Sequence, residues 1–137
     1  AGDSVCYRLD SCDGAMGVLT DTGYVTKESA EVLQGVSLLV LESNHDVKKL
    51  QGGPYPYYLK QRILGSAGHL SNDDAASFAI SAAKSGTKDV LLAHLSDENN
   101  TPDMALSTVR RALDAHGYEA VSLSVAPRSE SSAIHSL

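Results

Sequence analysis

A small set of acids and histidines lies where predicted strands end or predicted helices begin, and these residue types can bind divalent metal ions. Asp21 ends a β-like run and precedes a Thr-Gly turn, and His94 directly follows the apolar run Val-Leu-Leu-Ala. His69 lies in a glycine-containing stretch just before a predicted helix. A carboxylate oxygen and neutral imidazole nitrogens suit Zn²⁺, Mn²⁺ or Fe. Two such ions about 3.5–4 Å apart activate water for phosphoester or amide hydrolysis, so the pattern indicates hydrolytic metal chemistry.

The same three residues also fit structural roles, and their spacing leaves both explanations open. Asp21 suits an Asx-type turn into the Thr-Gly pair that follows it. His94 suits a partly buried histidine with satisfied hydrogen bonds, and His69 suits a residue just ahead of a helix cap. None of these residues has the close ligand spacing that marks a metal motif and would decide between the two explanations.

Two further candidates, Glu42 and His45, follow the short apolar run 37–41. Glu42 suits a residue that orients a metal-bound histidine, because such histidines usually donate their other ring N–H to a carboxylate or carbonyl. It equally suits a surface acid. His45 suits contact with the metal ligands or the substrate, and together with Asp46 it also suits the solvated start of a helix.

Aromatic and basic side chains gather between these sites, at Tyr55, Tyr57, Tyr58, Lys60 and Arg62. The tyrosines suit stacking on bases or lining a substrate groove, or pinning a loop to the core. Lys60 and Arg62 form the only small basic cluster near them, in a chain whose 17 acidic and 11 basic residues give a formal net charge of −6. A nucleic-acid role therefore needs bound metal cations or a small local patch, because an extended basic surface is excluded.

Length and composition are those of one globular domain: 137 residues, 42% hydrophobic and 20% charged. We predict a single domain over 1–137, with the polar stretch 129–137 as a frayed tail. No run approaches the roughly 18 apolar residues of a membrane span, and no leader pattern is visible. Two cysteines cannot form a disulfide framework. We therefore expect a cytoplasmic protein with no membrane partner.

Hydrophobic periodicity predicts a layered α/β fold, because buried strands alternate with amphipathic helices. Ligands in such folds lie beyond the carboxyl ends of the strands, which indicates the segments 20–23, 42–46 and 94–96. The predicted elements are strands 4–8 and 15–20 as a hairpin, helix 27–34, strand 37–41, helices 57–64 and 73–84, strand 89–93, a helix from Thr101-Pro102 to His116-Gly117, and strand 119–125.

Five ordered motifs together resemble a known family. They are Thr-Asp-Thr-Gly at 20–23, Leu-Glu-Ser-Asn-His-Asp at 41–46, Arg-Ile-Leu-Gly-Ser-Ala-Gly-His-Leu-Ser-Asn at 62–72, Leu-Ala-His-Leu-Ser at 92–96 and Val-Ala-Pro-Arg at 125–128. The chain resembles the metallo-β-lactamase-fold hydrolases, in the nuclease-like branch typified by YycJ/WalJ proteins. The resemblance implies the C-terminal half of an αββα sandwich, with a mixed β-sheet flanked by helices, as a partial domain over 1–137.

The resemblance also implies roles for single residues. Asp21 matches the metal-bridging aspartate and His94 the last metal-ligand histidine, while His69 matches a histidine beside the scissile phosphate that can donate a proton. Asp21 and His69 would thus be the catalytic pair, and Glu42 and His45 match positions behind the ligands or near the substrate. The implied cofactors are two divalent ions, Zn or Mn, with Fe as a further option.

One hallmark of the family is missing. Its His-x-His-x-Asp-His cluster does not occur, since the histidines stand at 45, 69, 94, 116 and 135. Asp21 and His94 are two ligands, where a catalytic zinc usually has three. Because the chain begins at Ala1 without Met, we expect a C-terminal fragment that alone binds metal partly or not at all and is inactive. Its expected partner is the missing N-terminal half, or a second copy.

Two functions follow from these observations. The first is a metal-dependent hydrolase, a phosphodiesterase or exonuclease on nucleic acid, active in the complete protein. The alternative is a non-catalytic α/β interaction module, or a degenerate relic of that fold, in which the polar strand-end residues are structural. DNA, RNA, a cyclic nucleotide and a small ester all remain compatible substrates, because one fold carries many chemistries.

Overall fold

The computed structural model describes residues 4–65 and 67–137. Ala1 and Ser66, which the expectations above mention, lie outside the described residues. The described chain forms, in order, β1 (Cys6–Ser11), β2 (Gly14–Leu19), α1 (Lys27–Val32), β3 (Leu38–Glu42), α2 (Val47–Gly52), α3 (Tyr57–Leu64), α4 (Asn72–Lys84), β4 (Asp89–Ala93), α5 (Pro102–Ala115) and β5 (Ser122–Val125).

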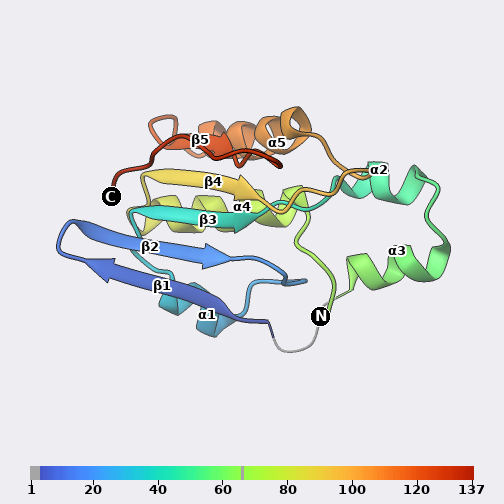
Figure 1. The fold of residues 1–137 in the computed structure, drawn as a ribbon, viewed down its shortest axis with the longest axis horizontal. Coiled ribbons are helices and arrows are strands. Elements are labelled where there is room, and N and C mark those ends of the chain that lie inside the picture. The colour runs from blue at the N-terminus through green and yellow to red at the C-terminus, as the bar shows by residue number, and fades with distance from the viewer. Residues whose placement is uncertain (1–3, 66) are drawn as a thin grey trace.

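The strands form one mixed sheet in the order β1-β2-β3-β4-β5 (Figure 1). β1 and β2 are antiparallel and form a hairpin across Cys12 and Asp13. The pairs β2–β3, β3–β4 and β4–β5 are parallel. Parallel neighbours require crossover connections, which α1, α4 and α5 supply. The predicted class, an α/β fold with a mixed sheet flanked by helices, is confirmed.

Side-chain caps fix where the crossover helices begin. Thr26, Ser71 and Thr101 each accept a hydrogen bond from the backbone N–H three residues later, at 3.0, 3.1 and 3.1 Å. Pro102 then occupies the first turn of α5, where its missing N–H has no cost. Because α4 and α5 begin directly after the site segments, these caps also fix the positions of the residues before them.

The helices α1, α4 and α5 all cover one face of the sheet (Figure 1). Alternate strand residues point toward these helices. The helices pack small and branched side chains against them, so the core is continuous. Its buried members are Ala15, Leu19, Leu33, Val36, Leu39, Leu41, Leu70, Ala75, Ala76, Phe78, Ala79, Ala82, Val90, Leu92, Ala105, Val109, Leu113 and Val121.

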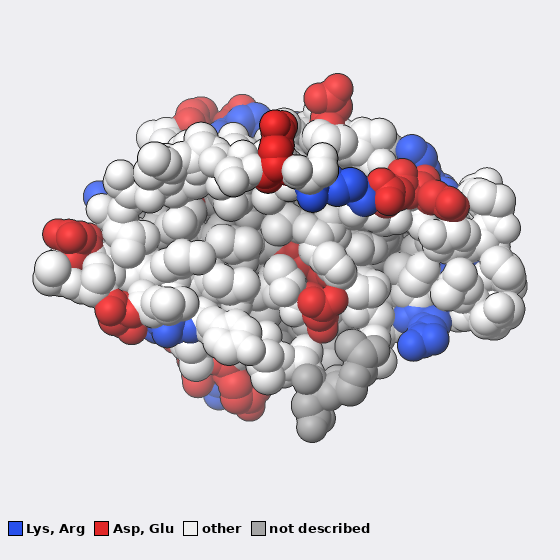
Figure 2. Space-filling view, viewed as in Figure 1, with Lys and Arg blue, Asp and Glu red and all other residues white. Residues whose placement is uncertain are grey.

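No described helix covers the opposite face of the sheet, which Figures 1 and 2 show from the front. The strand register places two apolar rows on this open face: Tyr7, Val18, Val40 and Leu91, and Leu9, Met16 and Leu38. Exposure rises toward the edge strand, where Tyr7 is 60% and Leu9 57% exposed. Charged side chains lie mostly at the margins of the face and near the strand ends (Figure 2).

The stretch 129–137, expected to fray, has no helix or strand but is attached to the sheet. His135 Nδ1 lies 2.6 Å from Asp89 Oδ2, and both side chains are largely buried. The register places Asp89 beside Leu38, on the open face. The expectation of a free tail is therefore wrong at His135. The sequence did not show that the side chain of Asp89 would be a hydrogen-bond partner for this residue.

Three local predictions need correction. The sequence offers a helix start at His45 and Asp46 as one alternative but does not predict α2 as an element, because Gly52-Gly53-Pro54 indicates a break and a helix of six residues is too short for a periodic pattern. The strand predicted over 119–125 begins only at Ser122, and the first strand is shifted to Cys6–Ser11. Among the described helices, none combines the length and hydropathy of a membrane-spanning segment.

Candidate metal centre

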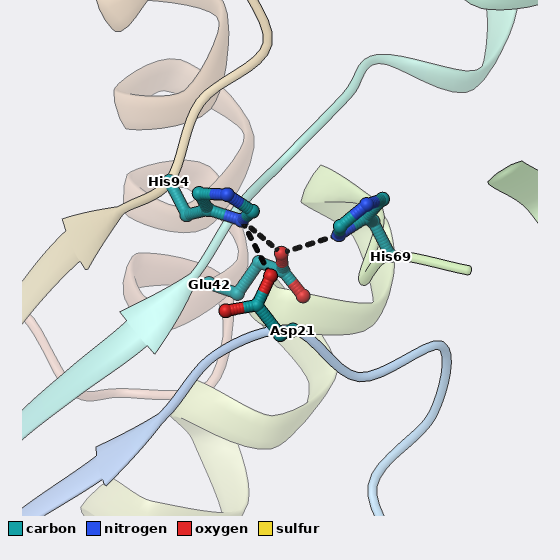
Figure 3. Close-up of side chains that lie close together, drawn as sticks. All are labelled: Asp21, Glu42, His69 and His94. Carbon is teal, nitrogen blue, oxygen red and sulfur yellow. Dashed lines mark hydrogen bonds and ion pairs between the residues drawn. The ribbon is translucent and has the colours of Figure 1, made fainter. Parts of the chain in front are cut away.

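Four side chains from separate parts of the sequence meet at the carboxyl edge of the sheet: Asp21, Glu42, His69 and His94 (Figure 3). One ligand-type atom from each lies within 4.8 Å of the others. Asp21 and His94, predicted to converge, are 3.7 Å apart between Oδ1 and Nδ1. The strand ends of β2, β3 and β4 and the loop before α4 therefore build the predicted site.

Glu42 is the centre of this group and is fully buried. Its Oε1 lies 2.6 Å from His94 Nδ1 and 2.9 Å from His69 Nδ1. Its Oε2 accepts hydrogen bonds from the backbone N–H of Thr22, at 3.2 Å, and of Leu70, at 3.1 Å. These four contacts use the lone-pair positions that a carboxylate offers. Glu42 is thus a positioning residue, and the surface-acid alternative is wrong.

The contacts of Glu42 also determine which nitrogen of each imidazole carries a proton. We assign Nδ1–H to both His69 and His94, because a carboxylate oxygen without a proton can only accept a hydrogen bond. Each ring then keeps Nε2 for a metal ion or for proton exchange. Histidines that bind metals are usually held in this way by a carboxylate.

Backbone strain is concentrated at the same site. Asp21 and His94 have φ values of 58° and 57°, and they are the only non-glycine residues with positive φ in the part of the chain that the structure describes. Strained residues of this kind persist where the surrounding structure fixes them, and they cluster at functional sites. Aspartate is one of the few residues that tolerate this conformation, but that does not explain the carboxylate's position beside His94.

His69 is positioned by a tight connection to α3. The N–H of His69 donates to Ile63 O at 3.2 Å, and the N–H of Gly68 donates to Gly65 O at 2.9 Å. A Cβ on Gly68 would lie 2.1 Å from Ile63 O, so only glycine fits. The backbone of His69 is therefore hydrogen-bonded directly to the end of α3.

A polar layer that sequence reasoning missed lies behind the site. Asn44 Nδ2 donates to His94 O at 2.9 Å, and the backbone of Asn44 bonds to Leu70 and Ser96. Asn72 and Asn100 bond to each other through their amides, and Ser43 Oγ donates to Asn72 Oδ1 at 2.6 Å. The signal was the polar run 42–46 directly after an apolar strand, whose residues 42–45 are all buried.

His45 lies outside the four-residue group. It is 1% exposed, its Nδ1 lies 3.3 Å from Asn44 Oδ1, and its Nε2 has no hydrogen-bond partner among the described residues. Burial, followed by the nearby His69, lowers the pKa of His45 below its usual value. The interpretation as a solvated helix start is therefore wrong for His45, while Asp46 does cap α2 by accepting from Lys49 N at 2.8 Å.

A cavity of about 470 Å³ opens beside the group. Asp21, His69 and His94 line one part of it, and Tyr55, Leu59 and Arg62 line another. Tyr57 and Tyr58 do not line it and are 77% and 75% exposed. Of the three tyrosines that the sequence offered as substrate contacts, only Tyr55 therefore faces the site.

The donor types fit part of a metal shell, with a carboxylate oxygen from Asp21 and Nε2 from His94. The nitrogen 3.7 Å from Asp21 Oδ1 is Nδ1, which Glu42 already holds. The side chains of Asp21 and His94 are 61% and 45% exposed, so an ion can reach both. A carboxylate oxygen with imidazole nitrogen suits Zn²⁺ or Mn²⁺. Glu42 has used its oxygens on the histidines and backbone, so a complete shell needs ligands beyond Asp21 and His94.

Comparison with known proteins gives related sequences. No family model matches the chain. The exodeoxyribonuclease YycJ of Bacillus anthracis is 37% identical over 118 residues, which are 86% of this chain and 45% of that protein. The exodeoxyribonuclease WalJ of Streptococcus pneumoniae is 43% identical over 103 residues, which are 75% of this chain and 38% of that protein.

The chain therefore spans less than half the length of these curated relatives. Among solved structures, a diphosphatase from the PhnP family matches 89% of this chain and 36% of its own, with 20% identity and a TM-score of 0.48. The sequence matches confirm the resemblance that the motifs indicated: over the part that it spans, the chain is a homologue of the YycJ/WalJ exodeoxyribonucleases.

Proposed function

We propose that the chain forms part of the active site of a longer, metal-dependent hydrolase that cleaves phosphodiester bonds in nucleic acid. The observation that carries the proposal is the buried Glu42, which holds two imidazoles beside the Asp21 carboxylate at the wall of an open cavity. The names of the curated relatives, both exodeoxyribonucleases, favour DNA as the substrate.

In this proposal Asp21 and His94 are metal ligands, and further ligands come from outside the chain. When bound, two divalent ions, Zn or Mn, polarise the phosphate and activate a water molecule. Glu42 keeps the His94 ring in one orientation, because their 2.6 Å hydrogen bond fixes the Nδ1 proton.

His69 has a different role in the proposal. It lines the cavity with a side chain that is 31% exposed, and its Nδ1–H stays on Glu42. Once Nε2 has also taken up a proton from solvent, it can pass that proton to the leaving oxygen, and His69 then acts as the general acid. Because the end of α3 holds its backbone, the ring keeps its place while the proton moves.

The open face of the sheet supports the expectation of a partner. Its apolar rows reach Tyr7 and Leu9, which are more than half exposed. Two-sheet folds bury such a face against a second sheet, and large exposed apolar patches mark interaction sites. We propose that the rest of the same fold covers this face in the complete protein, and that a second copy does so when the chain is alone.

One observation favours the alternative of a non-catalytic module: only Asp21 and His94 remain as ligands once Glu42 is assigned to positioning. Metal binding and cleavage separate the two functions. In the module, neither metal content nor nuclease activity of the complete protein depends on Asp21 or His94.

The experiment uses the complete protein, a labelled single-stranded oligodeoxynucleotide, and metal analysis of each dialysed variant. His94→Ala is expected to lose both metal and cleavage, whereas His69→Ala is expected to lose turnover and keep most of its metal. The control is His116→Ala, on an exposed residue at the end of α5. Equal metal loss in His69→Ala would make His69 a ligand, and full activity of His94→Ala would overturn the proposal.

A further inference from the structure

One wall of the cavity is built from a single face of α3 and the segment before it. Leu59, Arg62 and Ile63 line the cavity, and their i, i+3, i+4 spacing puts them on one side of the helix. Tyr55 lines it from the segment between α2 and α3. The wall thus offers an aromatic ring, an aliphatic surface and one cation.

Arg62 differs from most arginines of the chain. Arg8, Arg110 and Arg128 each bond to a nearby carboxylate, at 3.0, 2.8 and 2.6 Å. In residues 4–65 and 67–137, no hydrogen bond or ion pair engages the exposed Arg62 guanidinium. Its planar fork of donors matches the oxygens of a phosphate. It is also the one Lys or Arg among the described residues that line the cavity, which the carboxylate of Asp21 lines as well.

Tyr55 is held for contact with a flat ligand. Pro54 and Pro56 flank it, and both prolines restrict the backbone around the tyrosine. Tyr55 is half-buried, so its side chain loses little conformational entropy when the ring of a base stacks on it. Stacking on an aromatic side chain suits any base and is a common device for binding single strands.

The cavity wall formed by α3 is joined to the metal centre by a backbone hydrogen bond. Ile63, on the cavity face of α3, accepts the hydrogen bond from His69 N through its carbonyl, at 3.2 Å. Gly68 packs against the same turn with no room for a Cβ. The turn of α3 that carries Arg62 is therefore bonded directly to the backbone that carries the His69 ring.

We propose that Arg62 and Tyr55 form a subsite for the nucleotide that neighbours the scissile phosphodiester, with the guanidinium on its phosphate and the phenol ring on its base. This inference rests on the proposed function. A metal ion held by Asp21 would offset the charge of that carboxylate, but the next phosphate along the strand needs a cation of its own. Arg62 meets this need in a chain whose net charge of −6 otherwise repels nucleic acid.

The test compares three substrates with the complete protein: a single-stranded oligodeoxynucleotide, the same strand with abasic sugars at its end, and methyl 4-nitrophenyl phosphate. Arg62→Gln is expected to lower kcat/KM on both strands by about 10- to 100-fold, the loss for a hydrogen bond to a charged group. It should leave the small diester within about twofold of wild type. Arg62→Lys should recover part of the loss, because it keeps the charge without the fork.

Tyr55→Leu gives the second half of the test. We expect about a 5- to 100-fold loss on the natural strand, from the stacking of one base, and no loss on the abasic strand. Salt provides an independent measure: Arg62→Gln should make the slope of log kcat/KM against log salt shallower by about 0.7, the value for one phosphate of a single strand.

Matched controls are Arg111→Gln on α5 and Tyr57→Leu on α3, both exposed and neither lining the cavity. The subsite is overturned if Arg62→Gln behaves like Arg111→Gln on DNA, or if it slows the small diester as much as the strand. A wild-type protein inactive on all three substrates would count against the proposed function itself, and the subsite would fall with it.

Discussion

The buried carboxylate of Glu42 accepts a hydrogen bond of 2.6 Å from His94, a residue 52 positions later in the chain. The same oxygen holds His69, so one acid sets the orientation of both imidazoles. The backbone N–H groups of Thr22 and Leu70 hold the other oxygen. The geometry of the site is therefore built around a carboxylate of the chain itself.

Replacing Glu42 by Gln tests this arrangement. The amide oxygen can still accept from both backbone N–H groups, but the amide nitrogen then donates toward the histidines. We expect His69 and His94 to change tautomer, with the proton moving to Nε2, and metal affinity of the complete protein to fall about 10- to 100-fold. Nitrogen NMR of the two rings measures the tautomers directly.

Glu31→Gln is the matched control for this substitution. Glu31 is an exposed acid on α1 that lies 3.8 Å from Lys27. The Glu31→Gln substitution should change neither the tautomers of the two histidine rings nor the metal affinity, because exposed ion pairs contribute little. Unchanged Nδ1–H tautomers in Glu42→Gln would show that the carboxylate does not control the rings.

Asp21→Asn and His94→Asn separate metal binding from folding. Asparagine tolerates the positive φ of both positions, so the thermal midpoint of the chain should stay near that of wild type. Metal content of the dialysed complete protein should fall for both variants, because each loses a ligand. Asp13→Asn, in the exposed hairpin turn, is the control. Full metal content in either variant would remove that residue from the proposed shell.

Gly68→Ala should disturb His69 through packing alone. The added Cβ would lie 2.1 Å from Ile63 O, so the loop or α3 must move, and overpacking costs about 1–3 kcal/mol. Denaturant unfolding measures the loss. Gly52→Ala is the control: a Cβ there meets nothing within 4 Å, and alanine in a helix should raise stability by roughly 0.5–1 kcal/mol. Equal stabilities for the two variants would contradict the close contact.

Sequence reasoning found the strand-end residues but not how they are arranged. Asp21 and His94 could be predicted because polar residues at the carboxyl ends of parallel strands meet at one edge of the sheet. The central place of Glu42 could not, since it depends on which of the polar residues 42–46 points inward. That choice is made by contacts across the fold, to Thr22 and Leu70.

Other gaps have similar causes. His45 and Asp46 are adjacent and both polar, yet His45 is buried and Asp46 caps α2, because the buried segment 42–45 ends between them. The tail is attached through the contact of His135 with Asp89. These residues are 46 positions apart, so no local sequence pattern predicts the contact. Elements with clear caps and periods, such as α4 and α5, could be predicted nearly to the residue.

His45 should make stability depend on pH. Its pKa is lowered in the folded chain, mainly by burial and then by His69, so the unfolded chain binds a proton more readily. The stabilising contribution is therefore fully present above the usual histidine pKa of about 6.5 and is lost as the pH falls through the lower folded value. Urea unfolding with a chelator present, on either side of that range, should show a smaller loss on acidification in His45→Gln than in wild type. An identical pH dependence in both proteins would contradict the buried neutral ring.

We expect a substitution on the open face of the sheet to have different effects in the isolated chain and in the complete protein. Leu9 is 57% exposed on the edge strand β1, at the end of an apolar row. If a second sheet covers this row, Leu9→Glu should lower the free energy of unfolding of the complete protein by about 1.5–3 kcal/mol, the value of burying a leucine. In the isolated chain the same substitution should instead reduce self-association, because nothing else covers the row.

Sedimentation over a range of concentrations measures the association, and Tyr57→Glu is its control. Tyr57 is 77% exposed on α3, away from the open face, so its charge should alter neither association nor stability. An isolated chain that stays monomeric at high concentration would show that its own residues already protect the face. A complete protein in which Leu9→Glu has no more effect than Tyr57→Glu would show that the rest of the fold packs elsewhere, and the proposed partner would have to bind another surface.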